Sequence, residues 1–595
     1  MSDEADIGTQ RAEAVTGVAP RSAEEKRKDF FAACGIFLFA FGLYLLPAAF
    51  SRPISHADEA RVAVTAREMI QTGQYVVPTF AGEQDITPPL PYWVTAGAAQ
   101  VLTKQDGLTD PVIRNSVLLP SALLAACAIF LVVMYGCAVF GRPAGVISGL
   151  LLAFCLLTTR TAQLGNGDAI LLFTSALMFC SAAWIVTTAR PGFFAVLGLG
   201  VGLGLSVLTR GLLPVVLLAA PVLLEVLLRH RLNLRKIIVF VAALVVAAGI
   251  AGAWLVALQK RAPGSEAFIL ADLQNSFKAA SAGGFGYYSY ALVRGLLPWT
   301  VLLVLGWSLY LTAKTPGGGD PSGALVMARR NLRFFLLSFA TGMVVLSVLP
   351  QPSSGLLVMV VPALTLASAY ALAQFRFPGG VQEERFAWLV IFVGVIVAAA
   401  LATLPQWPDS VAQCVPGALT LKAIFAKSKL VLSLSVAAVA LIVHLVSARQ
   451  WVDGNPAAAV SAFAIAAYLG LAGWSWQYAV QTKNGCALCS EAPALRAKLD
   501  KDARVYGVGY SQAVLVYYLE RSAFTADDLT RETSAKPGES APERVLLFPR
   551  DKLACVEKDY GLTISEDIRK GKERVIVVPL PKEPLAVPET QKLKP

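Results

Sequence analysis

The sequence is built from long apolar segments, most of them close to the roughly 20 residues that an α-helix needs to cross a bilayer. Helices satisfy their own backbone hydrogen bonds in lipid, and these segments are too long and too uniformly apolar for barrel strands. The pattern therefore predicts an α-helical polytopic membrane protein with about 13 transmembrane helices. The segments cover residues 30–50, 112–140, 144–160, 168–189, 192–208, 211–228, 236–258, 291–313, 332–350, 354–374, 386–404, 428–447 and 458–478.

Composition and charge agree with a membrane protein. Of the 595 residues, 56% are hydrophobic and 15% are charged, whereas a soluble domain averages about 45–50% apolar and about 25% charged residues. The net charge is +11. Its basic residues gather in short loops and tails, as membrane topology requires, so the charge indicates no nucleic-acid partner.

The distribution of basic residues predicts the orientation. An odd number of spans puts the two termini on opposite sides, and each loop on the N-terminal side contains a basic residue, such as Arg142, Arg190 or Arg449. The positive-inside rule then makes the N-terminus cytoplasmic. The first apolar run exceeds the 7–15 residues or so of a cleavable signal core, so we expect an uncleaved anchor. One pair of the short, closely spaced segments between 144 and 228 could instead be re-entrant.

The domain organisation follows from the same pattern. Residues 1–29 are predicted to be a disordered cytoplasmic tail, 30–478 the transmembrane domain, with the polar loop at 51–111 outside the cytoplasm. Residues 479–595 are predicted to be a small extracytoplasmic α/β domain with a disordered end. Short β-prone runs at 504–508, 544–548 and 574–578, with an amphipathic helix at 511–520, predict its elements.

The cysteines carry one further pattern. Cys486 and Cys489 are separated by two residues, a spacing found in redox and zinc motifs. No histidine follows residue 478, so a structural disulfide in an oxidising compartment is the first interpretation. A zinc site and free thiols remain as alternatives.

The loop at 51–111 contains an ordered series of motifs. The motifs are Asp58-Glu59-Ala60-Arg61, Ala66-Arg67-Glu68-Met69, Gly73, Val77-Pro78, Gly82-Glu83, Pro88-Pro89-Leu90 and Tyr92-Trp93. This series resembles the first periplasmic loop of the aminoarabinose-transferase and protein-mannosyltransferase family of GT-C-type membrane glycosyltransferases.

This resemblance implies a function. A GT-C-type transferase of the bacterial inner membrane moves a hexosyl or pentosyl group from a polyprenyl-phosphate donor to an extracytoplasmic acceptor, with inversion. Lipid A or another envelope lipid is the first choice of acceptor, and a protein hydroxyl is the alternative. No cofactor follows from the sequence, and a divalent metal stays open. A transporter, a non-catalytic polyprenyl-lipid-binding protein and an envelope-assembly scaffold are the rival functions.

Three acids are the candidate catalytic residues. Asp58 could accept the proton of the incoming hydroxyl or amine, and Glu59 either supports it or is its solvated neighbour. An ordinary exposed loop is the alternative interpretation of this pair. Asp168 begins an apolar segment, where it could be an active-site acid, as the resemblance implies, or a helix-capping residue.

Cations and aromatic residues are the candidate substrate-binding groups, because a departing polyprenyl phosphate carries negative charge. Each of them could also be an ordinary interfacial anchor, since Arg, Tyr and Trp collect at that depth. The candidates are Arg61, Arg67, Pro88, Pro89, Tyr92, Trp93, Arg160, Arg210, Lys278, Tyr287, Tyr288, Arg294 and Trp299.

The chain also departs from the family pattern. The family usually has an acidic residue and Lys before the two prolines, where this chain has Ile86-Thr87. It tends to have a Lys-containing segment where this chain reads Gln351-Pro352-Ser353-Ser354-Gly355, and a His in the second outer loop that is missing here. These differences put the donor, the metal and catalytic competence in question.

Overall fold

The structure is a computed structural model, and its chain separates into two compact units. The membrane unit comprises residues 1–47, 88–90 and 118–477, and the loop–tail unit comprises 48–87, 91–117 and 478–595. The structure describes residues 21–49, 51–85, 87–103, 107–188, 191–229, 234–264, 284–312, 323–348, 353–374, 395, 442–443, 445–450, 453, 455–500, 503–525, 544–553, 556–557 and 574–580.

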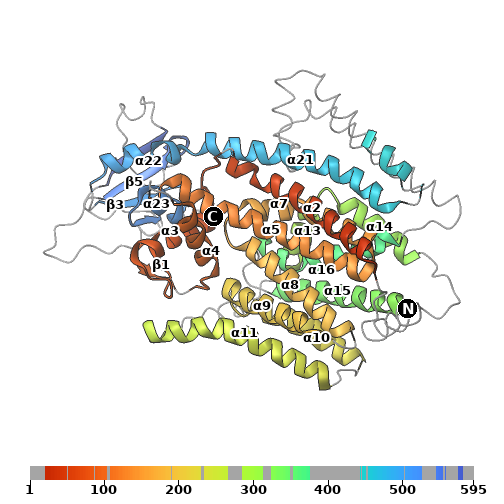
Figure 1. Ribbon diagram of the computed structural model, residues 1–595. Helices are drawn as coiled ribbons and strands as arrows, with labels where there is room; N and C mark the ends of the chain where they lie inside the picture. Colours follow the sequence, from red (N-terminus) through yellow and green to blue (C-terminus); the bar gives the residue numbers. More distant parts are fainter. Residues whose placement is uncertain are drawn as a thin grey trace. The chain divides into compact units, whose positions relative to one another are not determined.

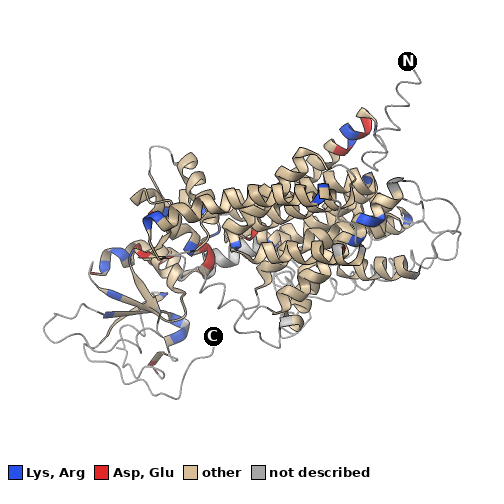
Figure 2. Ribbon diagram, turned by 90° about the horizontal axis from the view of Figure 1, so that it is seen from below, with Lys and Arg blue, Asp and Glu red and all other residues tan. Residues whose placement is uncertain are grey.

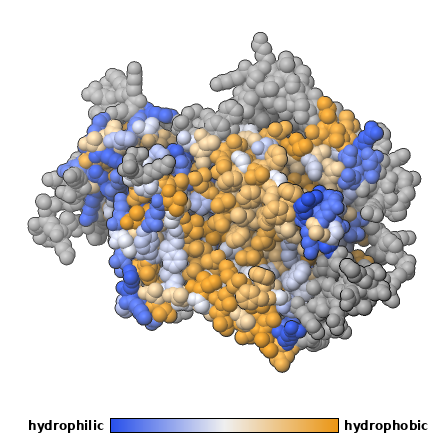
Figure 3. Space-filling view, in the orientation of Figure 1, coloured by the Kyte–Doolittle hydropathy of each residue, from blue (hydrophilic) through white to orange (hydrophobic). Residues whose placement is uncertain are grey.

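Long apolar helices make up the membrane unit (Figure 1). Seven of the described helices are long and apolar enough to cross a bilayer, or up to nine if each of two bent pairs is one span. Charged residues are sparse along them (Figure 2), and the surface over them is mainly hydrophobic (Figure 3). The helices are α2 (Ala23–Ala49), α5 (Asp110–Phe140), α6 (Arg142–Ala153), α7 (Leu156–Gln163), α8 (Asp168–Thr187), α9 (Phe193–Arg210), α10 (Leu213–Arg229), α11 (Leu234–Arg261), α13 (Gly284–Gly295), α14 (Thr300–Thr312), α15 (Gly323–Val348), η1 (Ser354–Met359), α16 (Val361–Ala373) and α21 (Pro456–Gly485).

Two segments predicted as single spans are broken. The run at 144–160 is α6 and α7, bent by 58°, and the run at 291–313 is part of α13 and α14, bent by 109°. A hydrogen bond joins the two breaks: the Leu156 amide at the first break donates to the Leu297 carbonyl at the second, at 2.9 Å. Irregular backbone at membrane depth is tolerated only where the protein provides such partners.

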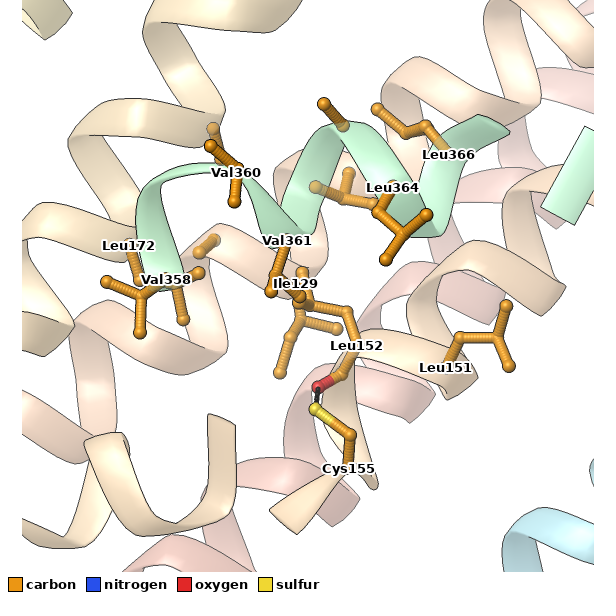
Figure 4. Close-up of a cluster of buried hydrophobic side chains, with 14 of the residues drawn as sticks. Ile129, Leu151, Leu152, Cys155, Leu172, Val358, Val360, Val361, Leu364 and Leu366 are labelled. Carbon is orange, nitrogen blue, oxygen red and sulfur yellow. Dashed lines mark hydrogen bonds between the residues drawn. The ribbon is translucent and has the colours of Figure 1, made fainter. Parts of the chain in front are cut away.

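Part of the core of the membrane unit lies between the η1–α16 segment and helices α5 and α6. Figure 4 shows Val361 at the start of α16 next to Ile129 of α5, with Leu364 of α16 and Leu152 of α6 in the same buried cluster. These side chains are at least nine-tenths buried. Close packing of this kind, rather than hydrophobic exclusion from lipid, holds helices together in a membrane.

The loop–tail unit combines the first loop with the C-terminal region. The predicted loop folds into α3 (Ala57–Thr72), the strand pair β1 (Thr79–Phe80) and β2 (Glu83–Gln84), and α4 (Leu90–Leu102). The C-terminal elements are α22 (Ala487–Lys498), β3 (Arg504–Gly507), α23 (Gln512–Leu519), β4 (Ala523–Thr525), β5 (Arg544–Pro549), η3 (Arg550–Lys552) and β6 (Val575–Pro579).

The C-terminal strands form one mixed sheet in the order β4-β3-β5-β6. β3 is parallel to β4 and β5, whereas β5 and β6 are antiparallel. The burial of Val545, Leu546, Leu547 and Phe548 on both faces of β5 explains why its sequence is continuously apolar. The α/β character predicted for this region is confirmed.

The α-helical membrane fold class with a small C-terminal α/β region is likewise confirmed. The number of 13 spans stays a prediction, because residues 386–404 and most of 428–447 lie outside the described residues. The domain boundaries at 29, 478 and 479 also stay predictions. Cys486 and Cys489, at the start of α22, are joined by a disulfide with a Cα–Cα distance of 5.3 Å.

Candidate active site

Asp58 and Glu59 lie in the first turn of α3, where carboxylates are stabilised by the helix dipole. The two side chains have opposite environments. Asp58 is exposed, and it forms no hydrogen bond or ion pair with another residue that the structure describes. Glu59 is completely buried. The adjacent acids therefore differ in what they can do, because only Asp58 is open to a reacting group.

Glu59 forms a two-point ion pair with Arg52. The Arg52 Nη1 donates to Glu59 Oε2 at 3.1 Å, and Nη2 donates to Oε1. Both side chains have no exposed surface. Removing two charges from water is costly unless the geometry satisfies both, as this fork-shaped contact does. The pair fixes the start of α3 to the segment before it.

The two arginines of α3 also have partners. Arg61 Nε donates to Asp85 Oδ2 at 2.8 Å, and the Arg61 guanidinium lies 5.3 Å from the Phe80 ring centroid. Arg67 Nη1 donates to Glu520 Oε1 at 3.3 Å. Arg61 and Arg67, both predicted to bind substrate, are thus paired with carboxylates of the protein itself.

Tyr92 and Trp93 hold α4 to the rest of the first loop. The Tyr92 and Thr87 hydroxyl oxygens are 2.9 Å apart, and Trp93 Nε1 donates to the Tyr75 carbonyl at 2.7 Å. Pro88 is partly buried and Pro89 is buried, and both immediately precede α4. Their local role is to end the preceding segment and start this helix.

Asp168 is the centre of a separate polar cluster in the membrane unit. It is the first residue of α8 and is 4% exposed. Arg210 Nη2 donates to Asp168 Oδ1 at 2.8 Å, and Asn166 Nδ2 donates to Oδ2 at 2.8 Å. Arg210 ends α9 and keeps 36% of its side chain exposed. The carboxylate is therefore held on two sides while the cation stays reachable.

The start of η1 packs against this carboxylate. A Cβ atom on Gly355 would lie 2.1 Å from Asp168 Oδ2, so only glycine fits there without displacing the acid. The Ser353 amide beside it donates to the Tyr288 hydroxyl oxygen at 3.2 Å. Tyr288 is fully buried and packs edge-on against the more exposed Tyr287.

The remaining candidate cations lie near the two helix breaks. Arg160 on α7 and Arg294 at the end of α13 are both exposed. Their helices touch, since a Cβ on Gly295 would be 3.0 Å from Leu157 Cβ. Trp299 is buried in the connection from α13 to α14. Lys278 lies outside the described residues. Among the residues that are described, no group of three or more His, Cys, Asp or Glu could hold a metal ion.

Comparison with known proteins finds similarity to the family that the first-loop motifs resemble. A family model described as dolichyl-phosphate-mannose-protein mannosyltransferase matches residues 87–255. Undecaprenyl phosphate-alpha-4-amino-4-deoxy-L-arabinose arabinosyl transferase 2 of Proteus mirabilis is 28% identical over 277 residues, which are 45% of this chain and 48% of the relative. The arabinosyl transferase of Aeromonas salmonicida is 27% identical over 388 residues, covering 62% of this chain and 66% of the relative.

The crystal structure of ArnT from Cupriavidus metallidurans bound to undecaprenyl phosphate has the same architecture. It matches with a TM-score of 0.67 and 18% identity, covering 91% of this chain and 97% of that chain. The chain has the GT-C-type fold of ArnT. The resemblance seen in the first-loop motifs is thereby confirmed. The matched sequences span only about half to two thirds of the curated relatives' length.

Within this ArnT-like fold, three residues of the two clusters were missed as site residues. Arg52 directly follows the first span, and its spacing of seven from Glu59 gave no helical pairing signal because α3 begins between them. Asn166, two residues before Asp168, has the local spacing of a side chain that bonds the next turn, a signal that could have been used. Gly355 was noted only as a departure from the family pattern, since its contact with Asp168 joins distant segments.

Proposed function

We propose that the chain is a membrane glycosyltransferase that moves a sugar from a polyprenyl-phosphate donor to an acceptor outside the cytoplasm, with inversion. Lipid A or another envelope lipid is the proposed acceptor, and the bacterial inner membrane is the proposed location. The sequence matches to arabinosyl transferases and the ArnT fold support this class. The observation that carries the proposal is the exposed Asp58 carboxylate, set on a helix turn that a buried ion pair fixes.

Asp58 is the proposed general base. The acceptor hydroxyl or amine attacks the anomeric carbon from the face opposite the phosphate, and its proton passes to Asp58. The bond from the anomeric carbon to the phosphate oxygen breaks, and polyprenyl phosphate leaves. Glu59 takes no proton in this scheme, because its carboxylate is buried against Arg52. Its proposed role is to position the turn that carries Asp58.

Arg210 is the proposed phosphate contact, and Asp168 is the acid that holds it ready. A guanidinium with an exposed fraction of 36% can turn part of its donor set toward a lipid phosphate. Such a contact strengthens as charge develops on the leaving group. Arg160 and Arg294 are further candidates, because both are exposed cations on touching helices. Tyr287 is exposed and is a further candidate contact, whereas Tyr288 and Trp299 are buried and support the surrounding segments.

The direct test is sugar transfer by the full-length protein in liposomes with a polyprenyl-phosphate aminopentose donor, the first choice from the relatives' names. We expect transfer by the wild type and a loss of about 10²–10⁴-fold for Asp58→Asn, which keeps the side-chain size but removes the base. Equal turnover by the two proteins would remove Asp58 from the mechanism.

Mass spectrometry of envelope lipids and glycoproteins from cells with and without the gene identifies the acceptor class. Loss of one sugar mass from lipid A or another lipid is the expected result. Loss from a protein instead would establish the protein O-glycosyltransferase alternative. An unchanged glycan profile in both fractions would count against transfer altogether.

The proposed orientation places the N-terminus in the cytoplasm and residues 479–595 in the periplasm. The basic loops on the N-terminal side support this arrangement. A reporter that is active only in the cytoplasm, fused after Pro595, should therefore be silent. Activity of that fusion would reverse the side assigned to the tail.

A further inference from the structure

Helix α3, which carries Asp58, shares a hydrophobic core with the C-terminal region. Ala60, Ala63 and Val64 on its inner face belong to one buried cluster with Leu515 and Tyr518 of α23. All five side chains are at least nine-tenths buried. The first loop and the tail are therefore a single folded unit, although more than 400 residues separate α3 from α23 in the chain.

A network of charges joins the far end of α3 to the same helix of the tail. Glu520, which ends α23 with a positive φ of 55°, accepts from Arg67 of α3 at 3.3 Å and from Arg496 of α22 at 2.9 Å. Arg496 Nε also donates to the Tyr518 carbonyl at 2.6 Å. The Arg67 guanidinium lies 5.7 Å from the Tyr517 ring centroid. Glu520 thus ties α3, α22 and α23 at one point.

Tyr518 connects the tail to the start of α3. Burial raises the pKa of its phenol well above the usual range, and the Glu59 and Asp110 carboxylates raise it further. A backbone hydrogen bond with Ile54 opposes this rise in the pKa. Tyr518 therefore lies beside Ile54, just before α3, and the two side chains belong to the same buried cluster. The tail contacts α3 at both of its ends.

We propose that the C-terminal region is the positioning element for Asp58, acting through Tyr518 at the start of α3 and the Arg67–Glu520 ion pair near its end. This inference rests on the proposed function, because it requires Asp58 to be the base. It assigns Arg67 a positioning role in place of a phosphate contact. A phosphate-binding Arg67 would change the donor KM, whereas a positioning Arg67 changes kcat.

The expected effect is on turnover and not on stability. Half of the Glu520 side chain is exposed, and ion pairs of this kind contribute at most about 1 kcal/mol to folding. A shift of a catalytic group by about 1 Å can nevertheless cost on the order of 10²-fold in rate. We therefore expect Arg67→Gln and Glu520→Gln to lower kcat by roughly 10- to 100-fold, with donor KM and melting temperature little changed.

A double-mutant cycle on the full-length protein in liposomes tests this coupling. Since both substitutions break the same contact, Arg67→Gln/Glu520→Gln should lower kcat no further than the more damaging single change. Arg521→Gln is the matched control. Its side chain lies one residue from Glu520 and donates to the Asp500 carbonyl at 2.5 Å, a contact within the tail. It should transfer sugar like the wild type.

Hydrogen exchange of the α3 amides separates failure of this inference from failure of the proposed function. Faster exchange over residues 57–72 is expected in Arg67→Gln and Glu520→Gln but not in Arg521→Gln. If the wild type transfers sugar and both single variants keep its kcat, the inference is wrong. A raised donor KM with unchanged kcat in Arg67→Gln alone would make Arg67 a phosphate contact. If the wild type transfers nothing while exchange rises as expected, the proposed function fails and the coupling of tail and α3 stands.

Discussion

Two arginine–carboxylate pairs, each with its acid in the first turn of a helix, differ in burial. In the Arg52–Glu59 pair of α3, neither side chain has any exposed surface. In the Asp168–Arg210 pair of α8 and α9, the acid side chain is 6% exposed and the arginine side chain 36% exposed. A fully buried pair cannot change partners without leaving a charge unpaired. A cation at a water-accessible edge can change partners. The Asp168–Arg210 pair is therefore able to bind a ligand, whereas the Arg52–Glu59 pair has a structural role.

Asp168→Asn tests the pair whose cation stays exposed. If Asp168 holds Arg210 for the reaction, turnover should fall by about 10- to 100-fold, no further than for loss of Arg210 itself. Stability should fall only modestly, because the partly exposed Arg210 can be hydrated by water when the charge of Asp168 is removed. Sugar transfer and a melting curve measure the two properties. Lowered stability with normal transfer would make Asp168 a structural residue and end the contrast between the pairs.

Breaking the buried Arg52–Glu59 pair should mainly lower the stability of the protein. Arg52→Met leaves Glu59 buried without its partner, so we expect a loss of about 3–5 kcal/mol in the free energy of unfolding. Adding Glu59→Met should recover most of that loss, since apolar replacement of both partners is often neutral. Arg61→Gln serves as the comparison, because its pair with Asp85 leaves 46% of the Arg61 side chain exposed and should contribute at most about 1 kcal/mol. Equal melting temperatures for Arg52→Met and Arg61→Gln would contradict this.

Substitutions of Arg210 test the cation of the Asp168–Arg210 pair. Arg210→Ala should lose about 10- to 100-fold in turnover, the equivalent of one hydrogen bond to a charged group at roughly 1.5–3 kcal/mol. Arg210→Lys should keep much of the activity if Arg210 acts on donor phosphate as a point charge. Transfer rates of the three proteins at saturating donor decide this. Identical rates would identify Arg210 as an interfacial anchor.

The smallest effect expected at this site is that of Gly355→Ala. The added methyl would press on Oδ2 of the Asp168 carboxylate, whose two oxygens are held by Asn166 at Oδ2 and by Arg210 at Oδ1. We expect overpacking to cost about 1–3 kcal/mol, together with a fall in turnover as the acid is displaced. Ser354→Ala is the neighbouring control in the same segment. Wild-type transfer by Gly355→Ala would show that the reaction tolerates a displacement of Asp168.

Several elements were predictable because their determinants are local. Helices α5, α8 and α11 were predictable as apolar runs, because polar groups are energetically costly in lipid. This cost applies to each segment independently of the others. Strands β3, β5 and β6 were visible as short β-prone runs between turn residues, whereas β4 (Ala523–Thr525) was not predicted. The breaks between α6 and α7 and between α13 and α14 were not, because each depends on the other for its backbone hydrogen bond.

The sequence by itself determined the class of the protein, its helical membrane part, and the motif series that points to a GT-C-type transferase. Only the tertiary structure decided which acid of the Asp58-Glu59 pair is exposed and that Arg67 meets Glu520. It also decided that Gly355 lies against Asp168. Apolar length and residue order are properties of one segment, whereas burial and ion pairing depend on which distant segments pack together. Adjacent residues with the same charge can therefore reach opposite environments.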